Sequence, residues 1–292
     1  YFGKVDRISP EAPVPIVNIQ KEESRLGGAS NVANNIVSLG GHSLLCGVIG
    51  HDLFGKEIER ISRHKNIDTF LLKTSSPTIT KARIIGGKQQ IVRVDYEDKS
   101  ELNADNKKLF RDTISRILPE YDILVISDYG KGLISEDLCR YLIKLAHKYD
   151  KKVIIDPKGK NWEKYSGADI VTPNVKELSD IVGYTVPNTD RAIEKAAREA
   201  ITNNHLTALL VTRSDKGMSL IGPIPPIHIP THSEEVFDVS GAGDTVVATL
   251  GLCLAAGFEI SEAMRTANIA AGIVVKKIGT ATLTIEELVQ QK

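Results

Sequence analysis

From residue 121 onward, short runs of apolar residues alternate with segments that have the period of amphipathic helices. The apolar runs contain few polar residues, which is typical of parallel strands that are buried on both faces. Helices are the usual connection between such strands. We therefore predict an α/β fold with a doubly wound parallel sheet, with strands at residues 123–127, 153–156, 169–172 and 207–212 and helices at about 136–149, 189–203, 243–256 and 261–277.

The first hundred residues have a different pattern. Residues 14–19 alternate weakly between apolar and polar, and the runs 78–85 and 90–96 flank a Gly86-Gly87-Lys88 segment that is typical of a hairpin. We predict a small separate sheet, formed by about residues 10–20 and 77–96. Such a sheet could serve as a lid over a site or as a dimer interface, and the pattern leaves both roles open.

Polar residues follow each predicted strand of the large sheet. In open parallel sheets, ligands bind beyond the carboxyl ends of the strands. A single polar strand end is expected of any solvated loop, but four in succession indicate a site. The residues concerned are Asp128 and Tyr129, Asp156 and Lys158, Asn174, and Thr212 and Arg213.

The charge balance limits the class of partner. The 292 residues include 37 Lys and Arg and 37 Asp and Glu, so the formal net charge is zero, and no block of five or six like charges occurs. Proteins that bind nucleic acids or membrane surfaces by electrostatics need a local surplus of cations. We therefore expect small-molecule substrates and neither of those partners. No apolar run approaches the ~18 residues of a membrane span, and no signal peptide is recognisable, so we expect a cytoplasmic protein.

Residues 50–56 have the spacing of a phosphate-binding P-loop. Glu57 follows them, however, where a P-loop requires a serine or threonine hydroxyl on the metal. A carboxylate at this position would face the phosphates. We predict a structural turn here.

The segment DVSGAGDT at residues 238–245 precedes an apolar segment that predicts a buried helix. Small residues before a helix allow backbone N–H groups to converge on an anion, and the helix dipole adds positive potential. Asp244 could accept a proton from a substrate hydroxyl while the amides of Gly241, Ala242 and Gly243 stabilise a transferring phosphoryl group. The alternative is that Asp244 only caps the helix. A cap does not require Gly-Ala-Gly before it, so the sequence favours an anion site.

This segment resembles the C-terminal signature of the ribokinase-like (PfkB-type) carbohydrate kinases. The segment GGASNVA at 27–33 is similar to the N-terminal signature of that family, NVKE at 174–177 to its NxxE motif, and TRSDKG at 212–217 to its nucleotide loop. The motifs occur in the family's order over the whole chain. The resemblance implies a three-layer α/β/α ribokinase-like domain over residues 1–292 with a small β-sheet lid, and it implies ATP and Mg²⁺ as cofactors.

Four further stretches look like the D-glycero-β-D-manno-heptose 7-phosphate kinase branch: RISPEAPVP at 7–15, TITKAR at 78–83, SDYGKG at 127–132 and DPKG at 156–159. This resemblance implies phosphorylation of the anomeric C1 hydroxyl in ADP-heptose and lipopolysaccharide inner-core biosynthesis. A kinase of another sugar or nucleoside is an alternative, and so is a sugar-binding homologue without catalysis. The retention of Asp244 and Glu177 argues against the last.

The resemblance also implies roles for single residues. Asp244 matches the catalytic base, and the amides of Gly241, Ala242 and Gly243 match the anion hole. The remaining matches are Gly27, Gly28 and Asn31 for the sugar, Glu177 with Asn174 for Mg²⁺ and the phosphates, Thr212, Arg213 and Gly217 for the nucleotide loop, and Asn268 near the base.

A substrate that already carries a phosphate needs a cation, and Arg83 and Lys158 are our candidates, with Asp128 as a further substrate contact. Asp238 is a candidate for contact with a monovalent cation. The resemblance implies a homodimer through the lid. It also implies an additional strand before Tyr1, because members of the family usually begin with a β-strand that ends in a Gly-Asp pair.

Overall fold

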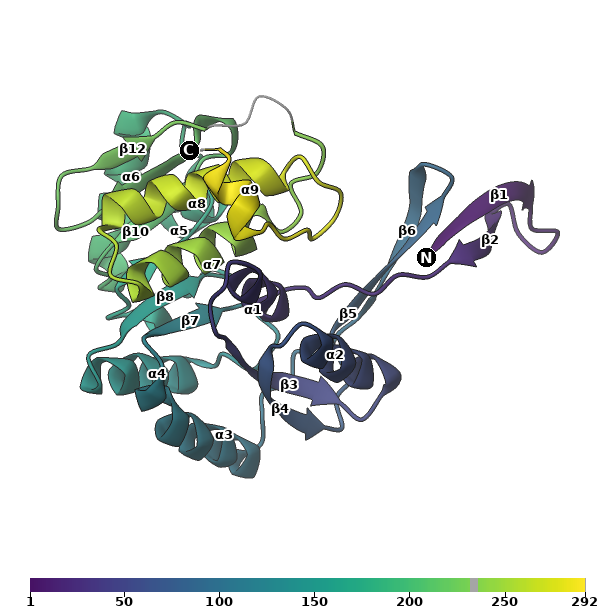
Figure 1. Cartoon of the computed structure of the whole chain (residues 1–292), viewed down its shortest axis with the longest axis horizontal. Helices are drawn as coiled ribbons and strands as arrows, with labels where there is room; N and C mark the ends of the chain where they lie inside the picture. Colours follow the sequence, from purple (N-terminus) through teal and green to yellow (C-terminus); the bar gives the residue numbers. More distant parts are fainter. Residues whose placement is uncertain (232–235, 292) are drawn as a thin grey trace.

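The chain forms a layered α/β body and a small sheet that projects from one side of it (Figure 1). The computed structural model describes residues 1–231 and 236–291. In this part of the chain, no helix combines the length and the apolar character that are needed to cross a membrane.

The large sheet has the strand order β12-β11-β10-β9-β8-β7. The four predicted strands are confirmed and pair in parallel: β7 (Ile123–Ser127), β8 (Lys152–Asp156), β9 (Ile170–Val171) and β10 (Leu209–Thr212). The sheet is mixed, however, because β11 (Met218–Ile221) and β12 (Ile227–Ile229) add an antiparallel edge that was not predicted. The short turn after Thr212 returns the chain along β10, and a crossover helix does not fit in so few residues.

Helices cover both faces of this sheet. The side chains of β8 show the two-sided burial, since Val153 and Ile155 belong to one apolar cluster and Ile154 to another. The first cluster includes residues of α3 (Ala104–Ile117), α4 (Glu136–Lys148), α5 (Val175–Val182) and α6 (Asp190–Asn204), and the second includes residues of α1 (Ala29–Ser38), α7 (Ala242–Ala255) and α8 (Ile260–Val274). The predicted three layers and the four predicted helices are therefore confirmed. The short α9 (Ile285–Val289) lies near the end of the chain.

A separate parallel pair continues the body beyond β7. It consists of β3 (Leu44–Gly50) and β4 (Asp68–Thr74), which are joined by α2 (Leu53–His64). Strand β3 does not bond to β7, although α1 packs against both strands.

The projecting sheet, which we call the lid sheet, has the order β2-β1-β5-β6. The predicted hairpin is confirmed as β5 (Thr80–Gly86) and β6 (Gln89–Tyr96). Strand β2 (Pro15–Lys21) corresponds to the weak alternation at residues 14–19. Strand β1 (Phe2–Ile8) was not predicted. It pairs antiparallel with β2 and parallel with β5, which is far away in sequence.

The P-loop-like residues form a structural turn, as predicted. Asp52 caps α2 by accepting a hydrogen bond from Gly55 N at 2.8 Å. Its carboxylate also accepts bonds from the backbone N–H and the hydroxyl of Thr78 at 2.7 Å, and Thr78 Oγ1 accepts one from Gly50 N at 2.8 Å. The turn therefore joins the carboxyl end of β3 to the base of the lid sheet.

Candidate active site

Asp244 lies in the first turn of α7 and is 6% exposed. Both of its carboxylate oxygens have a donor, since Asn31 Nδ2 donates to Oδ2 at 2.8 Å and the Tyr129 hydroxyl donates to Oδ1 at 3.1 Å. Burial raises the pKa of Asp244, and the two hydrogen bonds oppose this effect. The carboxyl group is therefore held in one orientation and is a stronger base than an exposed aspartate.

The glycines before Asp244 differ in the space around them. Gly241 has a φ of 81°, and a Cβ there would lie 2.9 Å from Asn31 Nδ2. Gly243 has an ordinary φ, and a Cβ there would meet nothing within 4 Å. The start of α7 thus presents backbone N–H groups toward open space beside Asp244, which is the arrangement that binds an anion at a helix N-terminus.

The segment at residues 27–33, which is expected to bind the sugar, lies beside Asp244. Asn31 is fully buried in α1, and its Oδ1 atom has no hydrogen-bond partner among the described residues. A buried amide oxygen without a partner is costly, so its position next to Asp244 indicates a donor from a ligand. Gly28 has a φ of 56° and packs against the Tyr129 ring. Gly27 and Gly28 line a cavity that also contains Asp244, which we call the cleft.

Tyr129 was noted at a strand end but was not predicted as a site residue. Burial and the charge of Asp244 raise its pKa, so the phenol stays neutral and donates its proton to Asp244. Asp128, the expected substrate contact, instead accepts bonds from Lys164 Nζ, from the Tyr165 hydroxyl at 2.7 Å and from Gly130 N at 2.7 Å. Its carboxylate is 3% exposed. Asp128 therefore fixes the loop that carries Tyr129, and its contact with the substrate stays a prediction.

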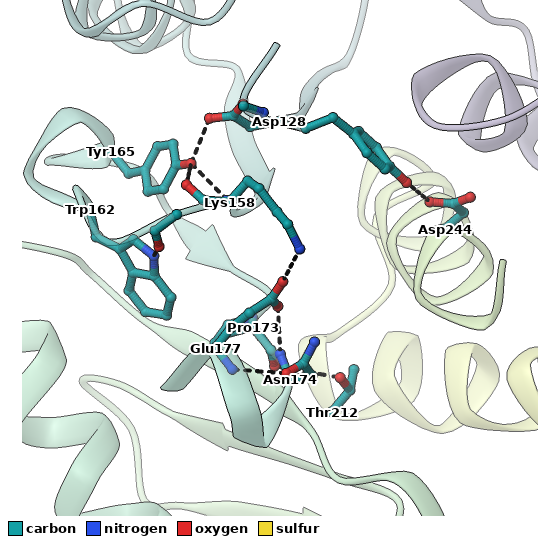
Figure 2. Close-up of polar contacts among 12 residues, drawn as sticks. Asp128, Lys158, Trp162, Tyr165, Pro173, Asn174, Glu177, Thr212 and Asp244 are labelled. Atoms are coloured by element: carbon teal, nitrogen blue, oxygen red, sulfur yellow. Dashed lines mark hydrogen bonds and ion pairs between the residues drawn. The ribbon is translucent and has the colours of Figure 1, made fainter. Parts of the chain in front are cut away.

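The NxxE motif forms the N-terminal cap of α5. Asn174 Oδ1 accepts a bond from Glu177 N at 2.9 Å, and Asn174 N donates to Glu177 Oε2 at 3.2 Å. Lys158 Nζ donates to Glu177 Oε1 at 3.0 Å, as Figure 2 shows. Lys158 was expected to bind the substrate phosphate. Its contact with the substrate stays a prediction, and in the free protein its ammonium group is paired with the Glu177 carboxylate.

The nucleotide-loop residues separate into two groups. Thr212 lies beside Asn174, to which it is joined by a β-bridge. Gly217 has a φ of 79°, and a Cβ there would lie 2.0 Å from Ile229 O, so the turn requires glycine. Arg213 points away, because its buried guanidinium binds Asn188, Asp190 and Ser219. The Arg213 side chain therefore has a structural role in the free protein, and its expected contact with the nucleotide stays a prediction.

Two further predicted residues lie at the borders of the site. Asn268 in α8 donates from Nδ2 to Pro230 O at 2.7 Å, and its role beside the base stays a prediction. Asp238 accepts bonds from Ser240 N and Gly279 N, which join two loops beside Gly241. Burial alone would raise the pKa of Asp238, but these hydrogen bonds lower it below its usual range. Its role toward a monovalent cation stays a prediction.

Asp156 was noted at the end of β8 but was not predicted as a site residue. Burial and the neighbouring charges of Asp244 and Glu177 raise its pKa to about 8. The site therefore has more negative charge than the protein compensates. Among the described residues, no group of three or more side chains could hold a metal alone. Mg²⁺ typically needs only one or two carboxylates together with water and substrate phosphates, so Asp156 and Glu177 fit this ion.

We expect Asp156→Asn to remove a pH dependence of stability. The folded pKa of about 8 lies above the unfolded value of about 4, so Asp156 lowers the stability of the ligand-free chain as the pH rises between these values. The fall is at most about 1.4 kcal/mol per pH unit. Urea unfolding at about pH 5 and pH 8 measures it. The exposed Asp105→Asn is the control, and an equal fall in Asp156→Asn and the wild type would contradict the prediction.

Comparisons with known proteins agree with this geometry. The model of the pfkB family carbohydrate kinases matches residues 2–287. The chain is 45% identical over 290 residues to the bifunctional protein HldE of Haemophilus influenzae (strain PittEE). The aligned region covers 99% of this chain and 60% of that protein. It is 43% identical over 291 residues to the bifunctional protein HldE of Paramagnetospirillum magneticum, and this aligned region covers 99% of this chain and 59% of that protein. The chain thus spans about 60% of the length of these relatives.

Solved structures show the same fold. The crystal structure of phosphofructokinase-2 from Escherichia coli in complex with potassium has a TM-score of 0.79 at 21% identity, covering 99% of this chain and 93% of that one. Ribokinase from Thermotoga maritima has a TM-score of 0.76 at 23% identity, and the match covers 99% of this chain and 94% of that chain. These similarities confirm the predicted ribokinase-like architecture.

Proposed function

Because the chain belongs to the pfkB family of carbohydrate kinases, we propose that it transfers the γ-phosphate of ATP to the anomeric C1 hydroxyl of D-glycero-β-D-manno-heptose 7-phosphate. The similarity to the HldE proteins over 99% of the chain supports this substrate. The observation that carries the proposal is the buried Asp244 carboxylate, which lies beside the open N-terminus of α7.

The residues of the site divide the chemistry between them. Asp244 takes the proton of the C1 hydroxyl, while Asn31 and Tyr129 hold its two oxygens in place. The amides of Ala242 and Gly243 stabilise the negative charge of the transferring phosphoryl group. Phosphoryl transfer depends mainly on such positioning and charge stabilisation.

Asp156 and Glu177 are our candidates for the Mg²⁺ ligands. Asp156 and Glu177 would hold Mg²⁺, which supplies positive charge to the nucleotide phosphates when it is bound. Glu177 would then exchange its bond with Lys158 for the metal. Lys158 would become free to contact a phosphate group, because its ammonium lies next to this carboxylate.

Arg83 is our candidate for the 7-phosphate of the sugar. It belongs to β5 of the lid sheet and lines the same cleft as Gly28 and Asp244. No ion pair of Arg83 occurs within residues 1–231 and 236–291, and its charge contributes to the lowered pKa of Asp238. Arg83 thus lies within electrostatic range of Asp238, whose hydrogen bonds join two loops beside Gly241.

We expect Arg83→Gln to raise the KM for the sugar 7-phosphate by about 30-fold, the equivalent of one charge-assisted hydrogen bond of about 2 kcal/mol. The KM for ATP should stay unchanged. An ADP-release assay with heptose 7-phosphate and unphosphorylated heptose measures this. Lys88→Gln, in the exposed hairpin of the lid sheet, is the matched control. A preference of the wild-type enzyme for the unphosphorylated sugar would contradict the proposed substrate.

We also propose a homodimer through the lid sheet. This sheet projects from the body and exposes apolar side chains, among them Val5, Ile8, Val92 and Val94. Exposed apolar groups on one small sheet are typical of an interface. Light scattering should find a dimer for the wild type and a monomer for the double variant Val92→Lys/Val94→Lys. An unchanged mass would contradict this assembly.

A further inference from the structure

The hydroxyl group of Tyr165 lies between two loops of the site. Tyr165 ends the short 3₁₀ turn η2 (Glu163–Tyr165), and its side chain is fully buried. The hydroxyl donates to Asp128 Oδ2 at 2.7 Å and accepts a bond from Lys158 N at 3.0 Å, as Figure 2 shows. Asp128 directly follows β7, and Lys158 lies in the loop after β8. One hydroxyl group therefore bonds to the loops that follow two neighbouring strands.

The two hydrogen bonds of this hydroxyl have fixed directions. Burial and the charge of Asp128 raise the pKa of Tyr165, so the phenol keeps its proton. The proton goes to the Asp128 carboxylate at 2.7 Å, because a charged acceptor is preferred to the carbonyl oxygen of Lys158 at 3.3 Å. The phenol oxygen accepts the bond from Lys158 N. Phenylalanine at this position would provide neither bond.

Each of the two loops leads to one half of the site. Asp128 precedes Tyr129, whose hydroxyl donates to Asp244 Oδ1 at 3.1 Å. On the other side, Lys158 Nζ donates to Glu177 Oε1 at 3.0 Å. Asp244 and Glu177 belong to different helices, α7 and α5. They are nevertheless connected through one buried hydroxyl group.

The backbone gives the two loops little direct connection. Strands β7 and β8 pair as far as Ser127 and Asp156, and Asp128 N donates to Asp156 O at 3.0 Å. In the part of the chain that the structure describes, no backbone hydrogen bond joins the two loops beyond this one. The position of Tyr129 relative to Lys158 therefore depends on side-chain bonds, and those of Tyr165 reach both loops.

We propose that Tyr165 is a positioning residue, which aligns the sugar side of the site at Asp244 with the nucleotide side at Glu177. The proposal rests on the proposed role of Asp244 as the base. In phosphoryl transfer the attacking and leaving oxygens lie roughly in line, and a misplacement of about 1 Å can lower the rate by about 100-fold. Because Tyr165 is fully buried, it acts through the two loops and not by contact with a substrate.

Tyr165→Phe tests this role, because it removes the hydroxyl and keeps the ring. We expect kcat to fall by about 10-fold, the equivalent of one lost hydrogen bond in the transition state. The dissociation constants of ATP and of the sugar, each measured alone by calorimetry, should change little. A residue with a merely structural role would lower the midpoint of thermal unfolding and leave kcat unchanged at 25 °C. An unchanged kcat in Tyr165→Phe would therefore overturn the proposal.

Two control variants accompany this measurement. Ile193→Val shortens a fully buried side chain of α6 and should lower the midpoint without an effect on kcat. Tyr184→Phe removes the hydroxyl of an exposed tyrosine, which also donates to a carboxylate, that of Glu199 at 2.9 Å. This variant should retain the wild-type kcat.

Double variants test the two connections of Tyr165. If Tyr165 acts through Tyr129, the double variant Tyr129→Phe/Tyr165→Phe should lose no more than about 30-fold in kcat, whereas two independent losses of about 10-fold would give about 100-fold. The effect of Tyr165→Phe should likewise be smaller when Lys158→Met is already present. Independent effects in either pair would overturn the role of Tyr165 as a connection between the two sides.

This proposal and the proposed substrate fail in different ways. Each result for Tyr165 is a ratio of kcat values, measured with the sugar that the wild-type enzyme phosphorylates fastest. A wild-type enzyme that prefers another sugar contradicts the proposed substrate, and the same ratios then still test Tyr165. An active Asp244→Asn enzyme contradicts the base, whereas an unchanged Tyr165→Phe enzyme contradicts only the positioning role.

Discussion

Asp244→Asn is expected to lower kcat by about 10³- to 10⁴-fold, which is the contribution of a positioned general base at its upper range. The amide cannot accept the proton of the sugar hydroxyl. ATP binding should change little, because Asp244 faces the sugar side through Asn31 and Tyr129. Steady-state ADP release and nucleotide titration measure the two effects separately.

Two variants separate the loss of the base from a loss of its orientation. Tyr129→Phe removes only the 3.1 Å hydrogen bond to Asp244 and should lower kcat by about 10-fold. Asp105→Asn changes an exposed aspartate in the first turn of α3 and should leave kcat unchanged. An Asp244→Asn enzyme with more than a tenth of wild-type turnover would contradict the general-base assignment.

Gly243→Ala is expected to lower kcat/KM by about 100-fold while it slightly stabilises the fold. The new methyl group meets no protein atom within 4 Å, so it enters the open space in which we propose that the phosphoryl group binds. Replacing a helical glycine by alanine without strain stabilises a protein by about 0.5–1 kcal/mol. The midpoint of thermal unfolding should therefore rise, while kcat/KM from steady-state kinetics should fall.

Gly241→Ala is the informative contrast to Gly243→Ala. Gly241 has a φ of 81°, and its Cβ would lie 2.9 Å from Asn31 Nδ2. Strain of this kind costs about 1–3 kcal/mol, so this variant should lose stability as well as activity. If Gly243→Ala also lost stability, the open space beside it would have to belong to the fold and not to a ligand.

The parallel strands could be predicted because continuous apolar runs, such as residues 123–127, are typical of strands that are buried on both faces of a sheet. The anion site beside Asp244 stays a prediction, which rests on the small residues before the apolar helix. The pairing of β1 with β5 could not, since it joins residues about eighty positions apart and β1 has little apolar alternation of its own.

At two strand ends, the sequence alone does not show what each polar side chain contacts. At the end of β7 the sequence shows two polar neighbours, Asp128 and Tyr129, and at the end of β10 it shows Thr212 and Arg213. Successive side chains leave a strand in opposite directions. Which of these side chains the protein itself holds depends on distant partners, such as Lys164 for Asp128 and Asp190 for Arg213, and the sequence does not show these contacts.

The cap of α5 has a consequence for nucleotide binding. Glu177 supplies a negative charge at the start of this helix, and Lys158 neutralises it. In the free protein, one N–H group of this helix end, that of Asn174, is thus already bonded to an internal carboxylate. A phosphate that binds to this N–H group would displace a partner of the same charge. Affinity at this end is then set by the difference between two similar contacts, so small changes in Glu177 or Lys158 can shift it in either direction.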